Sequence, residues 1–309
     1  MSSGSQTLVL PRSSFPVLLR DYAELTKARV TSLIMMTAWS GFYLGAHKSG
    51  LSSLSWSLVH AVVGIGLVSG GTAALNEVME RDLDALMRRT ASRPLPTGRM
   101  SQAHGLLAGL ALVGGGALYL GWATNALTGW LTLATALVYL GAYTPLKRVH
   151  PICTFIGAFP GAMPPLLGWT AIRGRFDGEA FVLFAIVFFW QFPHFLSIAW
   201  LYRDDYARAR IRMLPVVEAD GRSTARDIIL YSVALVPATL APALLGMAGS
   251  VYLIGALLLG GAMFWVAVRL AALHLPPSAP LSRQRARQLL QATVFYLPLL
   301  FALMMLNAR

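Results

Sequence analysis

Long stretches without a single Asp, Glu, Lys or Arg constrain what this chain can fold into. They cover residues 30–46, 51–75, 101–146, 149–172, 180–202, 228–268 and 288–308. A helix crosses the hydrocarbon core of a membrane in about 20 residues, so the stretches 101–146 and 228–268 are each long enough for two crossings. Small and turn-forming residues at 122–125 and 246–249 mark the two divisions. The pattern therefore predicts nine membrane-spanning helices.

The predicted fold class is an all-α integral membrane protein. A hydrophobic fraction of 56% with only 12% charged residues excludes an ordinary soluble domain of 309 residues. Helices are favoured over a membrane barrel, because barrel strands appear in a sequence as short segments of alternating polarity.

The distribution of Lys and Arg predicts the orientation. With the N-terminus in the cytoplasm, all but four of the 25 Lys and Arg lie on the cytoplasmic side; the exceptions are Lys48, Arg173, Arg175 and Arg309. This bias accounts for most of the net charge of +12, so we expect the lipid bilayer as a partner and no nucleic acid. Residues 1–20 are predicted to be a disordered cytoplasmic tail, and residues 21–309 a single intramembrane domain.

The predicted helices fall into two similar blocks. Helices 1–4 and helices 5–8 each carry a group of acidic residues after their second helix, which suggests two four-helix pseudo-repeats with a ninth helix left over. The two acidic loops, 76–99 and 202–227, are then expected to face each other across one cytoplasmic mouth.

The first acidic group predicts a metal site. Asn76, Glu80 and Asp84 are spaced at i, i+4 and i+8, so on a helix their oxygen atoms lie along one stripe. Such carboxylates suit Mg²⁺, which in proteins usually joins one or two carboxylates to substrate phosphates. The alternative is a solvated helix end with ion pairs at i+4, such as Glu77–Arg81 and Asp84–Arg88.

Further charged groups extend this site. Asp204 and Asp205 point about 100° apart on a helix, so only one of them is expected to face the cavity and form its second wall. Basic residues near these acids are candidates for binding phosphate, or else they anchor helix ends at the membrane surface. They are Lys27, Arg29, Arg88, Arg89, Arg93, Lys147 and Arg148.

Two other residues are singled out by their depth in the membrane. His194 lies inside the sixth predicted helix, where an ionisable group is a functional candidate; the alternative is a neutral histidine bonded to a neighbouring helix. Cys153 is the only cysteine and is expected to be a small buried residue.

Several segments together resemble the UbiA superfamily of intramembrane prenyltransferases. They are Leu25–Val30, the block 76–96, Tyr143-Thr144-Pro145-Leu146-Lys147-Arg148, Gly157–Trp169, and the region from His194 to Val217. The Tyr-Thr-Pro-Leu-Lys-Arg, Pro-Gly-Ala-Met-Pro-Pro and Asp-Tyr-Ala-Arg-Ala segments resemble the branch of that superfamily that acts on haem.

The chain departs from that family's pattern at three positions. Glu80 stands where the family usually has aspartate, Ala28 where it has proline, and Arg210 where it has glycine. The longer side chain of Glu80 keeps the charge but extends the reach of the carboxylate by one methylene group.

The resemblance implies an activity and its participants. Farnesyl diphosphate would bind through Mg²⁺ to Asn76, Glu80, Asp84 and Asp205, and its farnesyl group would pass to the 2-vinyl group of haem B, giving haem O after addition of water. The basic residues above, with Tyr143, Asp204 and His194, would bind substrate. The resemblance further implies the inner membrane, a cytoplasmic site mouth, and haem A synthase or oxidase assembly factors as partners.

Three alternatives remain open from the sequence. One is a related prenyltransferase with an aromatic or quinone-precursor acceptor. The second is a transporter, because two similar helical blocks are common in that class. The third is a haem-binding assembly factor without catalysis.

Overall fold

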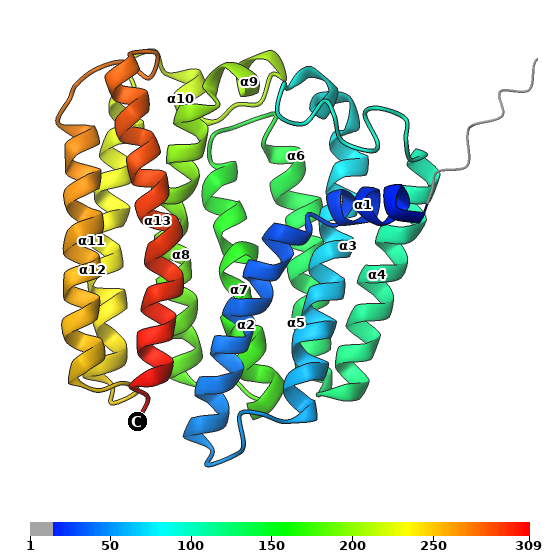
Figure 1. Cartoon of the computed structure of the whole chain (residues 1–309), viewed down its shortest axis with the longest axis vertical. Coiled ribbons are helices and arrows are strands. Elements are labelled where there is room, and N and C mark those ends of the chain that lie inside the picture. Colours follow the sequence, from blue (N-terminus) through cyan, green and yellow to red (C-terminus); the bar gives the residue numbers. More distant parts are fainter. Residues whose placement is uncertain (1–14) are drawn as a thin grey trace, which may run out of the picture.

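The computed structural model describes residues 15–309, and these form a bundle of long helices (Figure 1). In chain order the elements are α1 (Phe15–Leu25), α2 (Ala28–Lys48), α3 (Trp56–Leu86), α4 (Gln102–Ala123), α5 (Ala126–Val138), the π-helical turn η1 (Tyr139–Tyr143), α6 (Thr144–Leu146), α7 (Cys153–Arg173), α8 (Gly178–Leu201), α9 (Arg203–Arg208), α10 (Leu214–Val217), α11 (Arg222–Leu244), α12 (Ser250–Ala271) and α13 (Pro280–Leu306). The prediction of an all-α protein is confirmed for the described residues.

Eight of these helices are long and apolar enough to cross a membrane. They are α3, α4, the continuous helix Ala126–Leu146, α7, α8, α11, α12 and α13. α2 has 21 residues but is not among the eight, so the predicted count of nine is not confirmed. The divisions predicted at 122–125 and 246–249 are confirmed, because α4 and α5 separate at the first and α11 and α12 at the second.

Part of the segment predicted as a disordered tail is helical. Residues 15–20 are helical and belong to α1, which lies across the long helices near one end of the bundle (Figure 1). Residues 1–14 of that prediction lie outside the described residues. Arg99, from the loop between α3 and α4, holds α1 in place by binding Asp21 at 2.9 Å and Glu24 at 2.9 Å.

Neighbouring helices pack in chain order within each of the two predicted blocks. α3 packs on α4 and α4 on α5, while α8 packs on α11 and α11 on α12. The blocks join where α2 packs along α7, and α13 contacts α8, α12 and α2. The larger hydrophobic cluster lies mainly among α7, α8, α11, α12 and α13, and a second lies mainly among α2, α3, α4 and α5. The side chains of Leu131 and Met163 contact both clusters.

The contact between α2 and α7 depends on glycine. A Cβ atom added at Gly41 would lie 1.8 Å from the carbonyl oxygen of Pro165, and one added at Gly168 would lie 1.8 Å from that of Ala38. The two backbones are therefore packed so closely that no side chain fits between them. Small residues permit this approach in membrane bundles, where dispersion contacts largely drive association.

We expect Gly168→Ala to lower the free energy of unfolding by about 1–3 kcal/mol, because the added methyl group forces two backbones apart. Gly114→Ala is the matched control, since a Cβ at that helical glycine meets no atom within 4 Å. Thermal unfolding of both variants in the same detergent measures the difference. Equal stability of the two variants would show that the bundle absorbs the methyl group without cost.

The end of the described chain is bonded back into the fold at the opposite end from α9. Ala308 forms a β-bridge with Ala248, and the amide of Gly249 donates to the carbonyl of Asn307 at 2.9 Å. The amide of Arg309 donates to the carbonyl of Met247 at 3.0 Å. These contacts fasten the turn between α11 and α12.

Candidate functional site

The predicted stripe on α3 is formed and is buried. Asn76, Glu80 and Asp84 lie near the C-terminal end of α3, and all three are among the buried residues of the bundle. Polar groups at such positions are costly unless they find partners, because burial removes their bonds to water. The partners here come from other parts of the chain.

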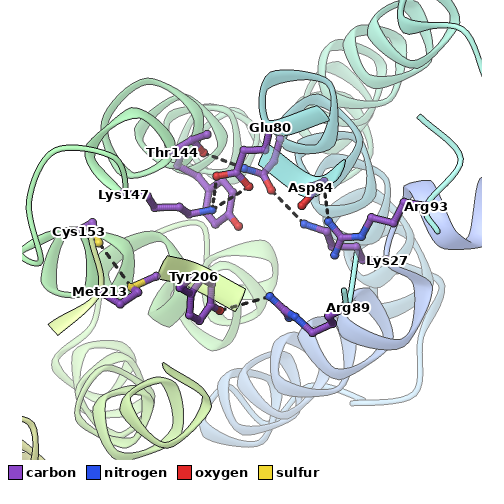
Figure 2. Close-up of polar contacts among 12 residues, drawn as sticks. Lys27, Glu80, Asp84, Arg89, Arg93, Thr144, Lys147, Cys153, Tyr206 and Met213 are labelled. Carbon is purple, nitrogen blue, oxygen red and sulfur yellow. Dashed lines mark hydrogen bonds and ion pairs between the residues drawn. The ribbon is translucent and has the colours of Figure 1, made fainter. Parts of the chain in front are cut away.

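Each of the three side chains accepts a hydrogen bond from a Lys or Arg side chain. The Lys27 ammonium group donates to Asn76 Oδ1 at 3.0 Å. The Lys147 ammonium group donates to both oxygens of Glu80, at 2.8 and 3.1 Å. The Arg93 guanidinium group donates to Asp84 Oδ2 at 2.7 Å. Figure 2 shows these charged side chains directed toward one another from separate segments.

Local backbone structure places Lys27 and Asn76. Lys27 joins α1 to α2 with φ at 48°, a left-handed conformation that is unusual for a residue other than glycine. Leu25, just before it, is buried against Ala74 and Leu95 and so fixes the end of α1. On the other side, the amide of Asn76 donates to the Thr144 hydroxyl at 3.1 Å, which sets which way that amide points.

The π-helical turn η1 places two aromatic rings beside Lys147. The Lys147 ammonium group lies 4.5 Å from the centre of the Tyr143 ring and 6.0 Å from that of Tyr139. Cation–π attraction at such distances adds to the ion pair with Glu80. π-Helical turns inside α-helices are frequent at functional sites.

The cations at this site affect each other. Lys27 lies outside the membrane-spanning segments, and its pKa is lowered to about 8, mainly by burial and also by the positive charges of Arg93 and Lys147. The carboxylates of Glu80 and Asp84 partly oppose this lowering of the pKa. The site therefore concentrates positive charge in a buried volume, which favours the binding of an anion.

The second acidic group reaches the same end of the bundle. Asp205 on α9 is buried and pairs with Arg208, while Asp204 is exposed, which confirms that only one of the two points inward. Arg208 also donates to the carbonyl of Leu86 at 3.4 Å, and Leu86 ends α3. The two acidic loops thus face each other as predicted.

An arginine fastens the two loops together. The Arg89 guanidinium group donates to the Tyr206 hydroxyl at 3.3 Å (Figure 2), and it lies 5.2 Å from the centre of the Tyr202 ring. On the far side, the amide of Arg212 donates to the carbonyl of Lys147 at 2.8 Å. The segment 202–213 is therefore tied both to the loop after α3 and to the end of α6.

Other predicted site residues lie away from this cluster. Arg29, Arg88 and Arg148 have exposed side chains near the same end of the bundle. His194 faces α13 instead, where its ring bonds the Thr293 hydroxyl at 2.9 Å and stacks on Trp190. The structure thus gives His194 the neighbouring-helix contact that was the alternative interpretation.

Sequence reasoning missed three residues of the site. Thr144 orients Asn76, and Tyr139 lies beside Lys147. The spacing of Tyr139, Tyr143 and Lys147 at i, i+4 and i+8 is the signal that would have identified Tyr139. Glu77 is fully buried, and neither of its carboxylate oxygens has a hydrogen-bond partner among the described residues.

The alternative of a solvated helix end does not fit the structure. In the part of the chain that the structure describes, neither Glu77–Arg81 nor Asp84–Arg88 is an ion pair, and Asp84 binds Arg93. Arg81 and Asp82 are exposed, and helical spacing places Asp82 on the opposite side of α3 from the stripe. The charged end of α3 is therefore divided into a buried side and a solvated side.

The site suits Mg²⁺ by the chemistry of its donors. No group of three or more His, Cys, Asp or Glu side chains among residues 15–309 is arranged to hold a metal by itself. Mg²⁺ rarely uses such a cage, because it takes one or two carboxylates together with water and substrate phosphates. Two carboxylates and an amide on one stripe meet that requirement. The arrangement can thus hold a metal on its oxygen side and an anion on its cationic side.

Comparison with known sequences identifies relatives over nearly the whole chain. The family model described as the UbiA prenyltransferase family matches residues 33–284. A protein of Koribacter versatilis (strain Ellin345) named protoheme IX farnesyltransferase is 65% identical over 307 residues, which cover 99% of both chains.

Solved structures share the fold. A structure reported for digeranylgeranylglyceryl phosphate synthase in membranes matches 94% of this chain and 98% of its own, with a TM-score of 0.75 and 15% identity. A UbiA homologue from Archaeoglobus fulgidus, solved with GPP and Mg²⁺ bound, matches 92% of this chain and 99% of its own, with a TM-score of 0.59 and 16% identity.

Proposed function

The chain belongs to the UbiA prenyltransferase family, and from this premise we propose that the site on α3 carries out the farnesylation of haem B. The enzyme joins C1 of farnesyl diphosphate to the 2-vinyl group of haem B. The bond from C1 to the diphosphate oxygen breaks, and water adds to the other vinyl carbon and loses a proton. Haem B, farnesyl diphosphate and water thus become haem O and diphosphate.

The observation that carries this proposal is the pairing of three buried oxygen-bearing side chains with three cations, of which Lys147 is itself buried. Lys27, Arg93 and Lys147, which bind Asn76, Asp84 and Glu80, would bind the oxygens of a diphosphate. A buried cationic group stabilises the charge that collects on a leaving diphosphate, and it does so more strongly than in water. The walls of the helical bundle keep water from the allylic carbon as its bond to oxygen breaks.

The same proposal assigns the metal. Asn76, Glu80, Asp84 and Asp205 would hold Mg²⁺, and Mg²⁺ bound there would neutralise charge on the leaving diphosphate. The Archaeoglobus fulgidus homologue solved with GPP and Mg²⁺ supports the use of Mg²⁺ with a prenyl diphosphate in this family. The remaining predicted residues would bind diphosphate or the haem substrate: Arg29, Arg88, Arg89, Tyr143, Arg148, His194 and Asp204.

The proposal also includes the number of membrane crossings and the orientation of the chain in the membrane. α2 packs along α7 inside the bundle, so we place it as a ninth crossing beside the eight apolar helices. With the N-terminus in the cytoplasm, the site faces the cytoplasm from the inner membrane. Residues 21–309 would form one catalytic domain, and haem A synthase or an oxidase assembly factor would receive haem O from it.

Purified protein with haem B, farnesyl diphosphate and Mg²⁺ tests the proposed reaction. We expect a product with the mass of haem O, read by chromatography and mass spectrometry, and no product when EDTA removes the metal. Parallel reactions offer an aromatic acid and a quinone precursor in place of haem. A folded protein that prenylates one of these and leaves haem unchanged would overturn the assignment of the acceptor.

The orientation of Asn76 leads to a further prediction. Thr144→Val removes the hydroxyl that accepts from the Asn76 amide, and an unsatisfied buried donor costs about 1–3 kcal/mol. We expect a less stable protein that needs more Mg²⁺ for half-maximal transfer. Thr135→Val is the control, because that hydroxyl donates only to the Leu131 carbonyl of its own helix. Equal Mg²⁺ titrations for the two variants would refute this role of Thr144.

A further inference from the structure

A cleft opens at the same end of the bundle, apart from the site on α3. It has a volume of about 400 Å³ and lies between the end of α8, the start of α11 and the end of α12. Its apolar lining includes Trp200, Ile229, Leu270 and Leu275. Its charged rim is formed by Asp220, Arg222 and Arg226. The cleft therefore combines an apolar surface with cationic groups.

The position of the cleft matches the boundary of a membrane. α11 begins at Arg222 and α12 ends at Ala271, and both helices are apolar enough to cross the bilayer. The lining thus lies where hydrocarbon gives way to lipid headgroups. A ligand at this level can place a phosphate on the rim and an acyl chain along the helices below.

Arg222 and Arg226 have N–H donors that their ion pairs do not use. Their side chains are 82% and 75% exposed, and each pairs with a neighbouring carboxylate: Arg222 with Asp220 at 3.2 Å and Arg226 with Asp227 at 3.1 Å. Exposed ion pairs of this kind contribute little, so an incoming phosphate can compete with them. A guanidinium group has five N–H donors, which allows it to bind a phosphate beside its carboxylate.

Glu218 and Trp200 near the cleft are already hydrogen-bonded within the protein, so Arg222 and Arg226 remain to bind an anion. The carboxylate of Glu218 already accepts from the amides of Ser223 at 2.9 Å and Thr224 at 2.8 Å, so it caps the start of α11. The indole of Trp200 donates to the Ser282 hydroxyl at 3.0 Å, and its ring lies beneath Gly221. The floor is therefore closed and apolar.

We propose that this cleft binds an anionic phospholipid, with its phosphate held by Arg222 and Arg226 and an acyl chain packed on Ile229, Leu270 and Leu275. The exposed guanidinium groups of Arg222 and Arg226 favour a headgroup with a net negative charge, and the apolar lining selects a lipid over free phosphate. This site is independent of the farnesyl transfer reaction, since none of its residues belongs to the site on α3.

Native mass spectrometry of the detergent-purified protein tests the proposal by titration with phosphatidylglycerol and with phosphatidylcholine. Each arginine near an anionic group contributes enough attraction for about a fivefold gain in affinity. We therefore expect phosphatidylglycerol to bind about five- to 30-fold more tightly than phosphatidylcholine. Arg222→Gln/Arg226→Gln should remove this preference. Arg283→Gln/Arg287→Gln, which loses the same charge from α13 at the same end, should keep it.

Two further arms decide the identity of the ligand. Asp220→Asn removes the carboxylate that competes with the lipid phosphate for Arg222. The preference of this variant for phosphatidylglycerol should therefore be greater than that of the parent. Glycerol 3-phosphate and haem B are offered as competitors, and neither should displace the lipid. No preference in the parent, an unchanged preference in the arginine variant, or full displacement by either competitor would overturn the proposal. Retained farnesyl transfer shows that each variant is folded.

Discussion

Asp84→Asn is expected to lower the rate of farnesyl transfer by about 10²- to 10³-fold, the scale seen when one group that stabilises developing charge is removed. Asp84 is buried, and its Oδ2 binds Arg93 at 2.7 Å. The substitution keeps the size of the side chain but removes the charge that both Mg²⁺ and Arg93 require. A titration of Mg²⁺ against the initial rate should also show weaker activation by the metal.

Asp82→Asn provides the matched control for that experiment. It makes the same chemical change two residues away on α3, at an exposed position outside the site. We expect its transfer rate and Mg²⁺ dependence to equal those of the parent. If both variants lose activity equally, the loss comes from a general change of charge near the membrane, and Asp84 has no special role.

The second large effect concerns the pair of Glu80 and Lys147. Only 9% and 10% of these side chains are exposed, and the two groups share two hydrogen bonds. Lys147→Met leaves the Glu80 carboxylate buried without its partner, which should destabilise the protein by about 3–5 kcal/mol. Thermal unfolding in detergent measures this loss, and farnesyl transfer should be lost as well.

A double substitution separates stability from catalysis. Glu80→Gln/Lys147→Met removes both charges, so most of the stability lost in Lys147→Met should return. Transfer should remain absent, because the diphosphate has lost a cation and the metal has lost a carboxylate. Recovery of activity together with stability would mean that the pair serves only to hold α3 against α6.

The sequence predicted the features of this protein that depend on local spacing. The stripe of Asn76, Glu80 and Asp84 follows from helical periodicity, and so does the burial of Asp205 beside an exposed Asp204. The divisions after α4 and α11 were predictable because turn-forming residues interrupt the apolar runs. Local patterns carry this information directly.

The partners of those residues could not be predicted, because they come from distant parts of the chain. Lys27 is 49 residues from Asn76, and Lys147 is 67 residues from Glu80. A spacing rule offered Arg88 as the partner of Asp84, but the loop after α3 turns so that Arg93 binds it. Only the tertiary fold decides which cation reaches which oxygen.

The nine-helix count is not confirmed, and residues 15–20 are helical where a disordered tail was predicted, for a different reason. Absence of charge alone placed α2 among the spans, and its sequence is less apolar than those of the eight helices. Residues 15–20 were assigned to the tail because their apolar run is short, but they form the first turns of α1. An amphipathic helix at a membrane surface needs no long apolar run.

The last residues of the chain have a practical consequence for handling the protein. Arg309 and Asn307 are hydrogen-bonded to the turn between α11 and α12. A purification tag or fluorescent reporter joined directly to Arg309 would pull on that turn. A flexible linker rich in Gly and Ser is therefore needed before any C-terminal fusion, because such a chain transmits little force to the residues that anchor it.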